Sequence, residues 1–99
     1  MRLMKQPIFR SEKWRRAVAS MPCVICGIEG QTQAAHRNQG KGMGAKVSDA
    51  WCAALCVDCH AAIDQSRDMN RDACRAMMDK AIFDTINLMA SEGVIEVRG

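Results

Sequence analysis

The sequence predicts a small α+β domain that is stabilised by a bound metal ion. Two Cys-x2-Cys pairs in one short chain are typical of structural zinc sites. Two short apolar runs, at 32–36 and 51–55, lie between the pairs and bracket a glycine-rich segment, which favours a two-stranded hairpin. Apolar side chains then recur at helical spacing, which predicts one long helix over 70–92. A chain of 99 residues has room for one domain with a modest core, spanning 1–99.

The segment before the first cysteine pair should be an arm followed by a helix. Residues 1–10 are expected to form an extended arm. Ser11 can cap a helix through its side-chain oxygen, and this helix should run to about Ser20. Pro22 then ends it, because proline cannot continue a helix. Residues 23–30 should form a tight turn with a glycine directly after the second cysteine.

The segment between the two cysteine pairs should run out and back. Residues 32–36 are a candidate strand, and residues 38–46, with three glycines and two lysines, must form a loop. Residues 51–55 are the candidate returning strand, although their periodicity alone does not exclude a helix. A short helix should begin within 57–64 and end near Gln65. Together with the cysteine pairs, these elements make up the expected core.

The C-terminal part should be one amphipathic helix. Asn70 is its expected cap, the last turn should lie near Ser91, and Gly93 should close its end. One face carries the side chains that we expect in the core, which are Cys74, Met77, Met78, Ala81, Ile82, Thr85 and Met89. Residues 94–98 are expected to be a short strand or a tail.

The composition also favours a structural metal. Aromatic side chains make up only 4% of the chain, so eight methionines and many alanines must fill much of the core. Such cores are loosely specified unless something else fixes them. The N-terminus lacks an apolar signal-peptide core and no apolar run is long enough to span a membrane, which predicts a cytoplasmic protein without a membrane partner. In that compartment six cysteines indicate metal binding more than disulfides.

The cysteine spacing favours zinc over other centres. Four thiolates in a tetrahedron suit Zn²⁺ best, whereas a thioredoxin-type redox pair would lie in a βαβ pattern that this sequence lacks. An iron–sulfur cluster is a weaker alternative. The predicted zinc ligands are Cys23, Cys26, Cys56 and Cys59. The two remaining cysteines, Cys52 and Cys74, are expected to be buried apolar residues.

The charge is unevenly distributed along the chain. Residues 1–46 carry nine Lys and Arg against two acids, or +7, and residues 47–99 carry five against nine, or −4. A basic half indicates a polyanionic partner, of which nucleic acid is the commonest, although a solvated surface is the simpler alternative. We therefore expect DNA as the partner.

Both histidines lie where they can take part in chemistry. His60 follows Cys59 directly, but four cysteines already close the zinc site, and a helix neighbour points about 100° away. Asp64 lies on the same helix face and can orient His60 or join it on a second metal. His36 ends the candidate strand beside a basic glycine loop, where it is well placed to deprotonate water. The cations expected to contact phosphate are Arg37, Lys41 and Lys46.

The zinc site should tie the two ends of the hairpin together. The helix that carries His60 would pack against the hairpin, so we expect His36 and His60 to face one another. A Mg²⁺ or other divalent cation at His60 would then grip a phosphate, while His36 activates the attacking water.

These motifs carry a family resemblance. AAHRN, the glycine loop and LCVDCHAAID, flanked by paired cysteines, resemble the HNH, or His-Me finger, endonucleases with their ββα-metal motif. The stretch AAHRNQGKGMGAKVSDAWCAALCVDCHAAID is also similar to the prophage-encoded YbcO-like proteins, which are predicted nucleases. The resemblance covers roughly residues 13–95 and is most specific over 23–64. It implies a ββα-metal core, with His36 as general base and His60 at the catalytic metal.

The sequence departs from the HNH pattern at two positions. Many HNH nucleases place Asp or His directly before the base as a second metal ligand, whereas this chain has Ala35. The middle Asn of the motif is not evident, and Asp49 or Trp51 lies nearest. The catalytic metal would therefore be held by His60, with Asp64 or Asp49 as a second ligand. Mg²⁺ accepts so few protein ligands because it keeps its waters.

Three functions fit these residues. The first is a metal-dependent DNA endonuclease that serves phage or prophage DNA processing or recombination. The second is a zinc-stabilised nucleic-acid-binding module without catalysis. The third is a zinc-knuckle protein-interaction domain that docks through its Met-rich helix. The basic half favours the first two, and the histidine pair favours the first, for which a homodimer would be the simplest way to cut both strands.

Overall fold

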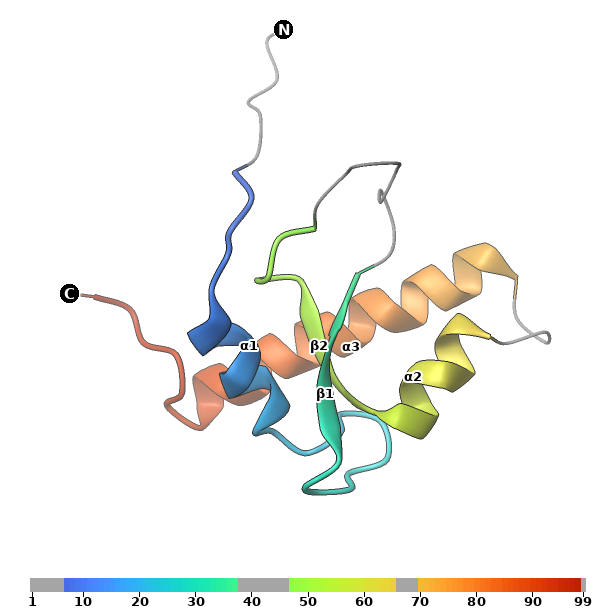
Figure 1. The fold of residues 1–99 in the computed structure, drawn as a ribbon, viewed down its shortest axis with the longest axis horizontal. Helices are drawn as coiled ribbons and strands as arrows, with labels where there is room; N and C mark the ends of the chain where they lie inside the picture. The colour runs from blue at the N-terminus through green and yellow to red at the C-terminus, as the bar shows by residue number, and fades with distance from the viewer. Residues whose placement is uncertain (1–6, 38–46, 66–69, 99) are drawn as a thin grey trace, which may run out of the picture.

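A computed structural model describes residues 7–37, 47–65 and 70–98, and it confirms the α+β class. Within these residues, two antiparallel strands form a hairpin that packs against three helices (Figure 1). Helix α3 crosses behind the hairpin, whereas α1 and α2 lie on its two sides. None of the helices in this part of the chain is long and apolar enough to cross a membrane.

Helix α1 (Glu12–Ala19) begins where the sequence predicts. The Ser11 side chain accepts a hydrogen bond from a backbone N–H of the first turn at 3.0 Å, which satisfies one of the N–H groups that a helix start leaves free. Before it, the Phe9 carbonyl accepts a hydrogen bond from the Asp49 N–H at 2.8 Å. The described end of the predicted arm, residues 7–10, therefore lies against the chain that leads into the second strand.

Strands β1 (Thr32–His36) and β2 (Cys52–Cys56) confirm the predicted hairpin. Their register pairs Thr32 with Cys56 and His36 with Cys52. One end of the hairpin therefore lies at the second cysteine pair, and the other end lies at His36.

The side chains of the hairpin alternate between two apolar clusters. Ala35 and Leu55 join a cluster with side chains of α2 and α3. Ala34 and Ala54 point to the other face and join a cluster that contains Val18 of α1. All five residues of β2 are buried because both of its faces are covered. This two-sided burial explains why the sequence of β2 shows no polar alternation.

The outer edge of β2 is closed by α3 (Arg71–Ser91). The Ala54 N–H donates to the Thr85 hydroxyl at 2.9 Å, and this hydroxyl donates to the Ala81 carbonyl at 2.7 Å. Thr85 is fully buried. Among the described residues no third strand pairs with this N–H. The Thr85 hydroxyl satisfies it instead, as a buried sheet edge requires.

The remaining helix boundaries also follow the sequence. Helix α2 (Val57–Asp64) continues directly from β2. Asn70 caps α3 by accepting a hydrogen bond from a first-turn N–H at 2.7 Å. Gly93 follows the end of α3 with a φ of +74°, a conformation that side chains rarely adopt. Residues 94–98 contain no strand, so they form the tail that was one of the two expectations.

The predicted core face of α3 needs one correction. Met78, Ala81, Ile82, Thr85 and Met89 are buried as expected. Met77, however, is 38% exposed. It precedes Met78 by one residue, which turns its side chain about 100° away from the buried stripe.

Candidate functional site

The four predicted zinc ligands come together in the structure. The sulfur atoms of Cys23, Cys26, Cys56 and Cys59 all lie within 4.8 Å of one another. The first pair lies in the turn after α1, where the Gly27 N–H donates to the Cys23 carbonyl at 2.8 Å and Gly27 has a φ of +79°. The second pair lies where β2 passes into α2, with the Cys59 N–H 3.4 Å from Cys56 Sγ. Two tight turns therefore aim four thiols at one point.

The spacing of the sulfur atoms fits a tetrahedral zinc ion. With Zn–S bonds of about 2.3 Å, two sulfurs of a tetrahedron lie about 3.8 Å apart. Cys26 Sγ and Cys56 Sγ are 3.7 Å apart. A disulfide would bring them to about 2.05 Å, and all six cysteines are free. The cluster is thus a candidate structural zinc site, as the sequence predicts.

The backbone prepares one of these thiols for metal binding. Burial raises the pKa of Cys23, but hydrogen bonds from the N–H groups of Cys26, Cys56 and Ile25 outweigh it and lower this pKa to about 6. The pKa of Cys59 is raised, first by burial and then by the neighbouring thiols. Because the thiolate is the form that binds metals, Cys23 presents a ready ligand at neutral pH.

The other two cysteines lie outside the cluster. Cys52 is buried, and burial followed by the nearby Asp49 charge raises the pKa of its thiol to about 12. Cys74 is half-buried and packs at the margin of the core. Cys52 therefore confirms the prediction of a buried apolar residue, and Cys74 meets it only in part.

His36 forms a hydrogen-bonded pair with a buried carboxylate. Its Nε2 lies 2.8 Å from Asp49 Oδ1, and 34% of the His36 side chain is exposed while that of Asp49 is fully buried. The other oxygen, Oδ2, accepts hydrogen bonds from the Ser11 N–H at 2.7 Å and from the Arg15 guanidinium at 2.8 Å. Both carboxylate oxygens therefore have partners, as a buried charge requires.

The surroundings keep Asp49 ionised. Burial raises the pKa of Asp49, but the hydrogen bonds from His36 and Ser11 and the charges of Arg15 and Arg10 together lower it. When the Nε2–H of His36 donates to this carboxylate, Nδ1 is left as the nitrogen that can accept a proton. The pair therefore has the form of a general base whose ring is held by a carboxylate.

His60 lies between β1 and its own helix. Its Nδ1 is 3.0 Å from Gln33 Oε1, and its Nε2 is 3.0 Å from Asp64 Oδ2. These two contacts hold the ring of His60 between a side-chain amide of β1 and the Asp64 carboxylate. The prediction that Asp64 shares a helix face with His60 is thus confirmed.

The prediction that His36 and His60 face one another is wrong. Gln33, the partner of His60, and His36 are three residues apart on β1, so their side chains leave opposite faces of the strand. His36 turns toward Asp49 and α1, whereas His60 stays on the side of α2. Ala35 points to the side of α2, but it is buried in the core and offers no ligand.

Arg37 makes contacts that the sequence does not reveal. Its guanidinium forms two hydrogen bonds with the Asp79 carboxylate, at 2.6 and 3.2 Å, and lies 5.7 Å from the centre of the Trp51 ring. The hydrogen bond to Asp79 raises the pKa of Arg37 further. The other predicted phosphate contacts, Lys41 and Lys46, lie outside the described residues.

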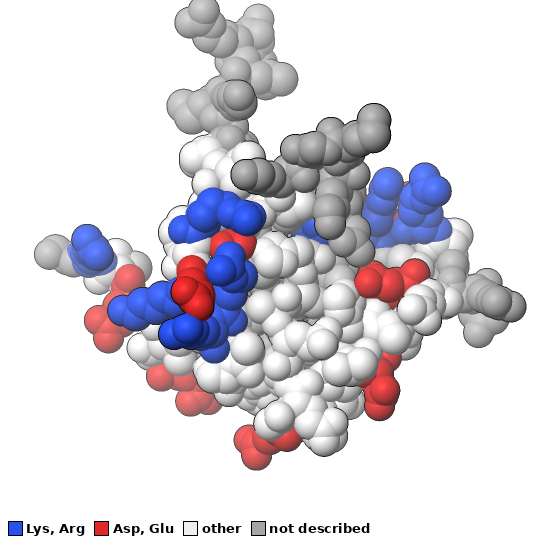
Figure 2. Space-filling view, viewed as in Figure 1, with Lys and Arg blue, Asp and Glu red and all other residues white. Residues whose placement is uncertain are grey.

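A basic surface covers α1 and the chain before it. Figure 2 shows Lys and Arg side chains gathered there, with acidic side chains spread more widely over the rest of this view. The basic residues of this segment are Arg10, Lys13, Arg15 and Arg16. Because Arg10 and Arg15 also approach Asp49, the basic surface adjoins the His36–Asp49 pair.

Sequence reasoning missed several of the residues in these contacts, among them Gln33, the partner of His60. Asp49 was considered only as a metal ligand, and neither Arg15 nor Asp79 was singled out. One signal was available for Asp49, because it is the only acidic residue between Glu29 and Asp58. Arg15 and Asp79 lie among other charged residues, and nothing in the sequence distinguishes them.

These features define a small α+β protein with a four-cysteine cluster that can hold a metal ion and a histidine–carboxylate pair. The chain belongs to the family described as "Protein of unknown function (DUF968)", whose model matches residues 1–81. This range includes the hairpin, both cysteine pairs and about half of α3. Comparisons with curated proteins and with solved structures found no match.

Proposed function

We propose that this protein is a metal-dependent endonuclease that hydrolyses phosphodiester bonds in DNA. The succession of β1, β2 and α2, with a histidine ending β1 and another in α2, supports the ββα-metal core that the HNH resemblance implies. The basic surface over α1 supports a polyanionic substrate. Processing of phage or prophage DNA is the setting that the YbcO-like resemblance implies.

The observation that carries the proposal is the hydrogen bond between His36 Nε2 and Asp49 Oδ1. A buried, ionised carboxylate fixes the orientation of the ring and stabilises the imidazolium that forms when Nδ1 takes a proton. His36 thus has the roles of general base and temporary proton carrier for the attacking water. Asp49 acts through His36 and is a positioning residue.

The His60–Asp64 pair is the proposed site of the catalytic cation. For an octahedral ion with bonds of about 2.1 Å, two neighbouring ligand atoms lie about 3.0 Å apart. His60 Nε2 and Asp64 Oδ2 are 3.0 Å apart, so these two atoms fit one coordination edge. A divalent cation bound there would neutralise the charge of a backbone phosphate on the α2 side of β1 and so help to hold the substrate. The phosphate at His36 would lie about 10 Å further along the strand.

The separation of the two histidines limits how DNA can bind. Three residues of strand correspond to about 10 Å along β1, and the two side chains leave opposite faces. In the described residues β1 pairs with β2 alone, so its outer edge has no strand partner. A substrate that reaches both groups therefore has to pass over this outer edge of β1.

The test is nicking of supercoiled plasmid in Mg²⁺ or Mn²⁺ by the wild-type protein and by His36→Ala and His60→Ala. Loss of a positioned general base costs about 10²- to 10⁴-fold in rate, so His36→Ala should fall by that factor. Lys80→Ala is the control, because it removes an exposed ion pair on α3 and should leave the rate unchanged. Each protein must first be shown to keep its zinc.

Three results would contradict parts of the assignment. If His36→Ala nicks at the wild-type rate, then His36 is not the base. If the wild-type protein cleaves neither plasmid nor branched nor single-stranded DNA, the nuclease proposal fails for these substrates. If His60→Ala loses zinc, His60 supports the structural site rather than a second cation.

A zinc-stabilised nucleic-acid-binding module is the second candidate, and the basic surface over α1 favours it. It predicts DNA affinity that falls steeply with salt and that survives in His36→Ala. Salt-dependent DNA binding without cleavage of any DNA substrate would favour the binding module over the nuclease.

A further inference from the structure

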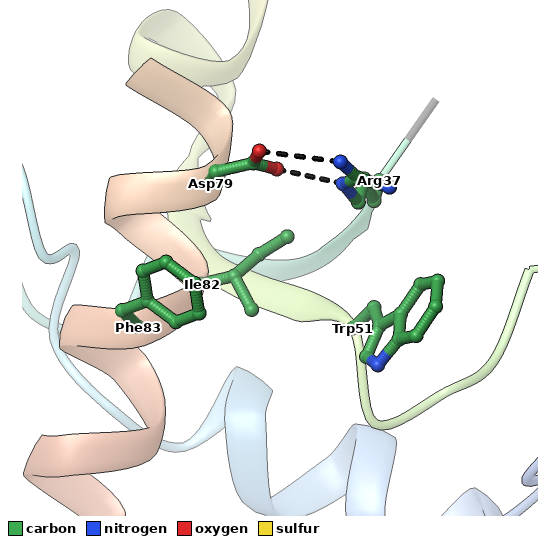
Figure 3. Close-up of a pocket in the computed structure, with 5 residues that line it drawn as sticks. All are labelled: Arg37, Trp51, Asp79, Ile82 and Phe83. Atoms are coloured by element: carbon green, nitrogen blue, oxygen red, sulfur yellow. Dashed lines mark hydrogen bonds and ion pairs between the residues drawn. The ribbon is translucent and has the colours of Figure 1, made fainter. Parts of the chain in front are cut away.

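We infer that a cavity beside His36 holds one unpaired base of a bound nucleic acid. This inference rests on the proposed function, because it names the part of the substrate that the chain recognises. The cavity has a volume of about 320 Å³ and is lined by Arg37, Trp51, Asp79, Ile82 and Phe83. Figure 3 shows the indole of Trp51 and the ring of Phe83 at its two sides, Ile82 between them, and the Arg37–Asp79 pair at one end.

The lining has the chemistry that a nucleobase needs. Trp51 is 42% exposed and Phe83 is 69% exposed, so the exposed parts of both rings offer a stacking surface to a flat ligand, beside the Arg37 guanidinium that lies over Trp51. Bases of every kind stack on such faces, and a guanidinium plane adds to the stacking. The side chains of Arg37 and Asp79, 23% and 33% exposed, offer donors and acceptors to the edge of a base.

The position of the cavity links it to the His36–Asp49 pair. Arg37 follows His36 directly, and its N–H donates to the Trp51 carbonyl at 3.0 Å. Trp51 in turn lies two residues after Asp49. The cavity therefore occupies the same end of the hairpin as the proposed general base. Because Arg37 and His36 are neighbours in the chain, the cavity lies on the α3 side, whereas the His36 ring lies on the α1 side. A strand whose base enters the cavity would have to cross the edge of β1 to bring a phosphate to His36.

The size of the cavity favours a base over a protein partner. A volume of this order matches the lower end of small-ligand pockets, which begin at about 300 Å³. A stable protein interface needs roughly 20 to 30 residues on each side, whereas five residues line this cavity. One base fits this space. An apolar helix would offer no hydrogen-bond partners to the Arg37–Asp79 pair at the end of the cavity.

The experiment compares two single strands of equal length and equal charge. One is an ordinary DNA oligonucleotide, and the other is a chain of abasic deoxyribose phosphates. Binding is measured without Mg²⁺ or Mn²⁺ and with zinc retained, by anisotropy of a dye on the strand. The wild-type protein should bind the ordinary strand about 5- to 150-fold more tightly than the abasic strand, which is the range for one stacked base.

Variants assign this preference to the cavity. Trp51→Ala and Phe83→Ala should reduce the preference without changing the slope of log K against log salt, because phosphate contacts remain. Trp51→Phe keeps a stacking face and should keep most of the preference. Val97→Ala is the matched control, since Val97 is 96% exposed and does not line the cavity. In a Trp14→Phe background, the ordinary strand should quench Trp51 fluorescence and the abasic strand should not.

Three outcomes would overturn the inference. The first is equal affinity of the wild-type protein for the two strands. The second is a preference that Trp51→Ala and Phe83→Ala, with zinc retained, leave intact. The third is self-association of the chain that Phe83→Ala abolishes, which would show that a second copy covers the cavity. The binding experiment does not depend on cleavage. A preference for the ordinary strand without nicking of any DNA would support base binding in the cavity and refute the nuclease proposal. Nicking without such a preference would support the nuclease proposal and refute base binding in the cavity.

Discussion

Replacement of one cluster cysteine should weaken zinc binding and remove about a quarter of the stability that zinc provides. The perturbation is Cys26→Ser, and Cys74→Ser is its matched control, because Cys74 is also a free cysteine but lies outside the cluster. Cys26 is exposed, so serine at this position creates no cavity in the apolar core. Any large effect of Cys26→Ser must therefore come from the metal.

The magnitude follows from the geometry of the cluster. The 3.7 Å between Cys26 Sγ and Cys56 Sγ matches a zinc tetrahedron, so the ion needs no rearrangement to bind. Structural zinc sites bind with an apparent free energy of about 10 to 16 kcal/mol, and a quarter of this is about 3 kcal/mol for each ligand. In a domain of this size, 1 kcal/mol lowers Tm by about 4 to 8 °C, so Cys26→Ser should lower it by about 12 to 24 °C.

Native mass spectrometry and thermal unfolding measure the two quantities together. The wild-type protein and Cys74→Ser should carry one zinc ion per chain, and Cys26→Ser should carry little at the same free zinc concentration. Cobalt-loaded wild-type protein should show the thiolate charge-transfer and visible bands of a tetrahedral sulfur site. The reasoning is refuted if Cys26→Ser matches Cys74→Ser in both zinc content and Tm, or if a chelator leaves the wild-type Tm unchanged.

Two further predictions concern stability. Thr85→Val leaves the buried Ala54 N–H without a partner, which costs about 1 to 3 kcal/mol of stability, and the added methyl offsets about 0.8 kcal/mol of this. Urea unfolding should therefore show Thr85→Val to be less stable than the wild type. An unfolding midpoint equal to that of the wild type would contradict the role of the hydroxyl. Asp49→Asn weakens charged hydrogen bonds and should cost about 2 kcal/mol at pH 7, with the half-exposed Arg15 contributing least. Because the folded pKa of Asp49 is lowered, its contribution is complete above its ordinary pKa of about 4 and is lost as the pH falls through the folded pKa. The difference between Asp49→Asn and wild type should therefore shrink below about pH 4, and a difference equal at pH 7 and pH 3 would refute this account.

The helices and strands could be predicted because their signals are local. Ser11 and Asn70 cap the helices that follow them, and Gly93 adopts the positive φ that ends α3. The cysteine cluster was predictable for a related reason. Each Cys-x2-Cys pair folds within its own turn, and the preference of zinc for four ligands favours two such pairs on one ion.

The contacts around His36 could not be predicted because they join distant segments. Asp49 reaches back to Ser11 and Arg15 across more than thirty residues, and Arg37 reaches forward to Asp79 across 42. Helical or strand periodicity carries no information about such partners. Strand alternation shows that His36 and Gln33 leave opposite faces of β1. This separates His36 from His60 only because the structure shows that His60 contacts Gln33.

The register of the hairpin connects the zinc site to the His36–Asp49 pair. Thr32 pairs with Cys56 at the metal end and His36 pairs with Cys52 at the other end, four residues or about 13 Å away. A metal in the cysteine cluster is therefore too far from His36 to act on the same phosphate. Its effect on chemistry has to be indirect, because it holds the start of β1 and the end of β2. A slip of one residue would turn every β1 side chain to the opposite face and carry His36 away from Asp49. Zinc should therefore be required for the proposed cleavage even though it touches no reacting atom.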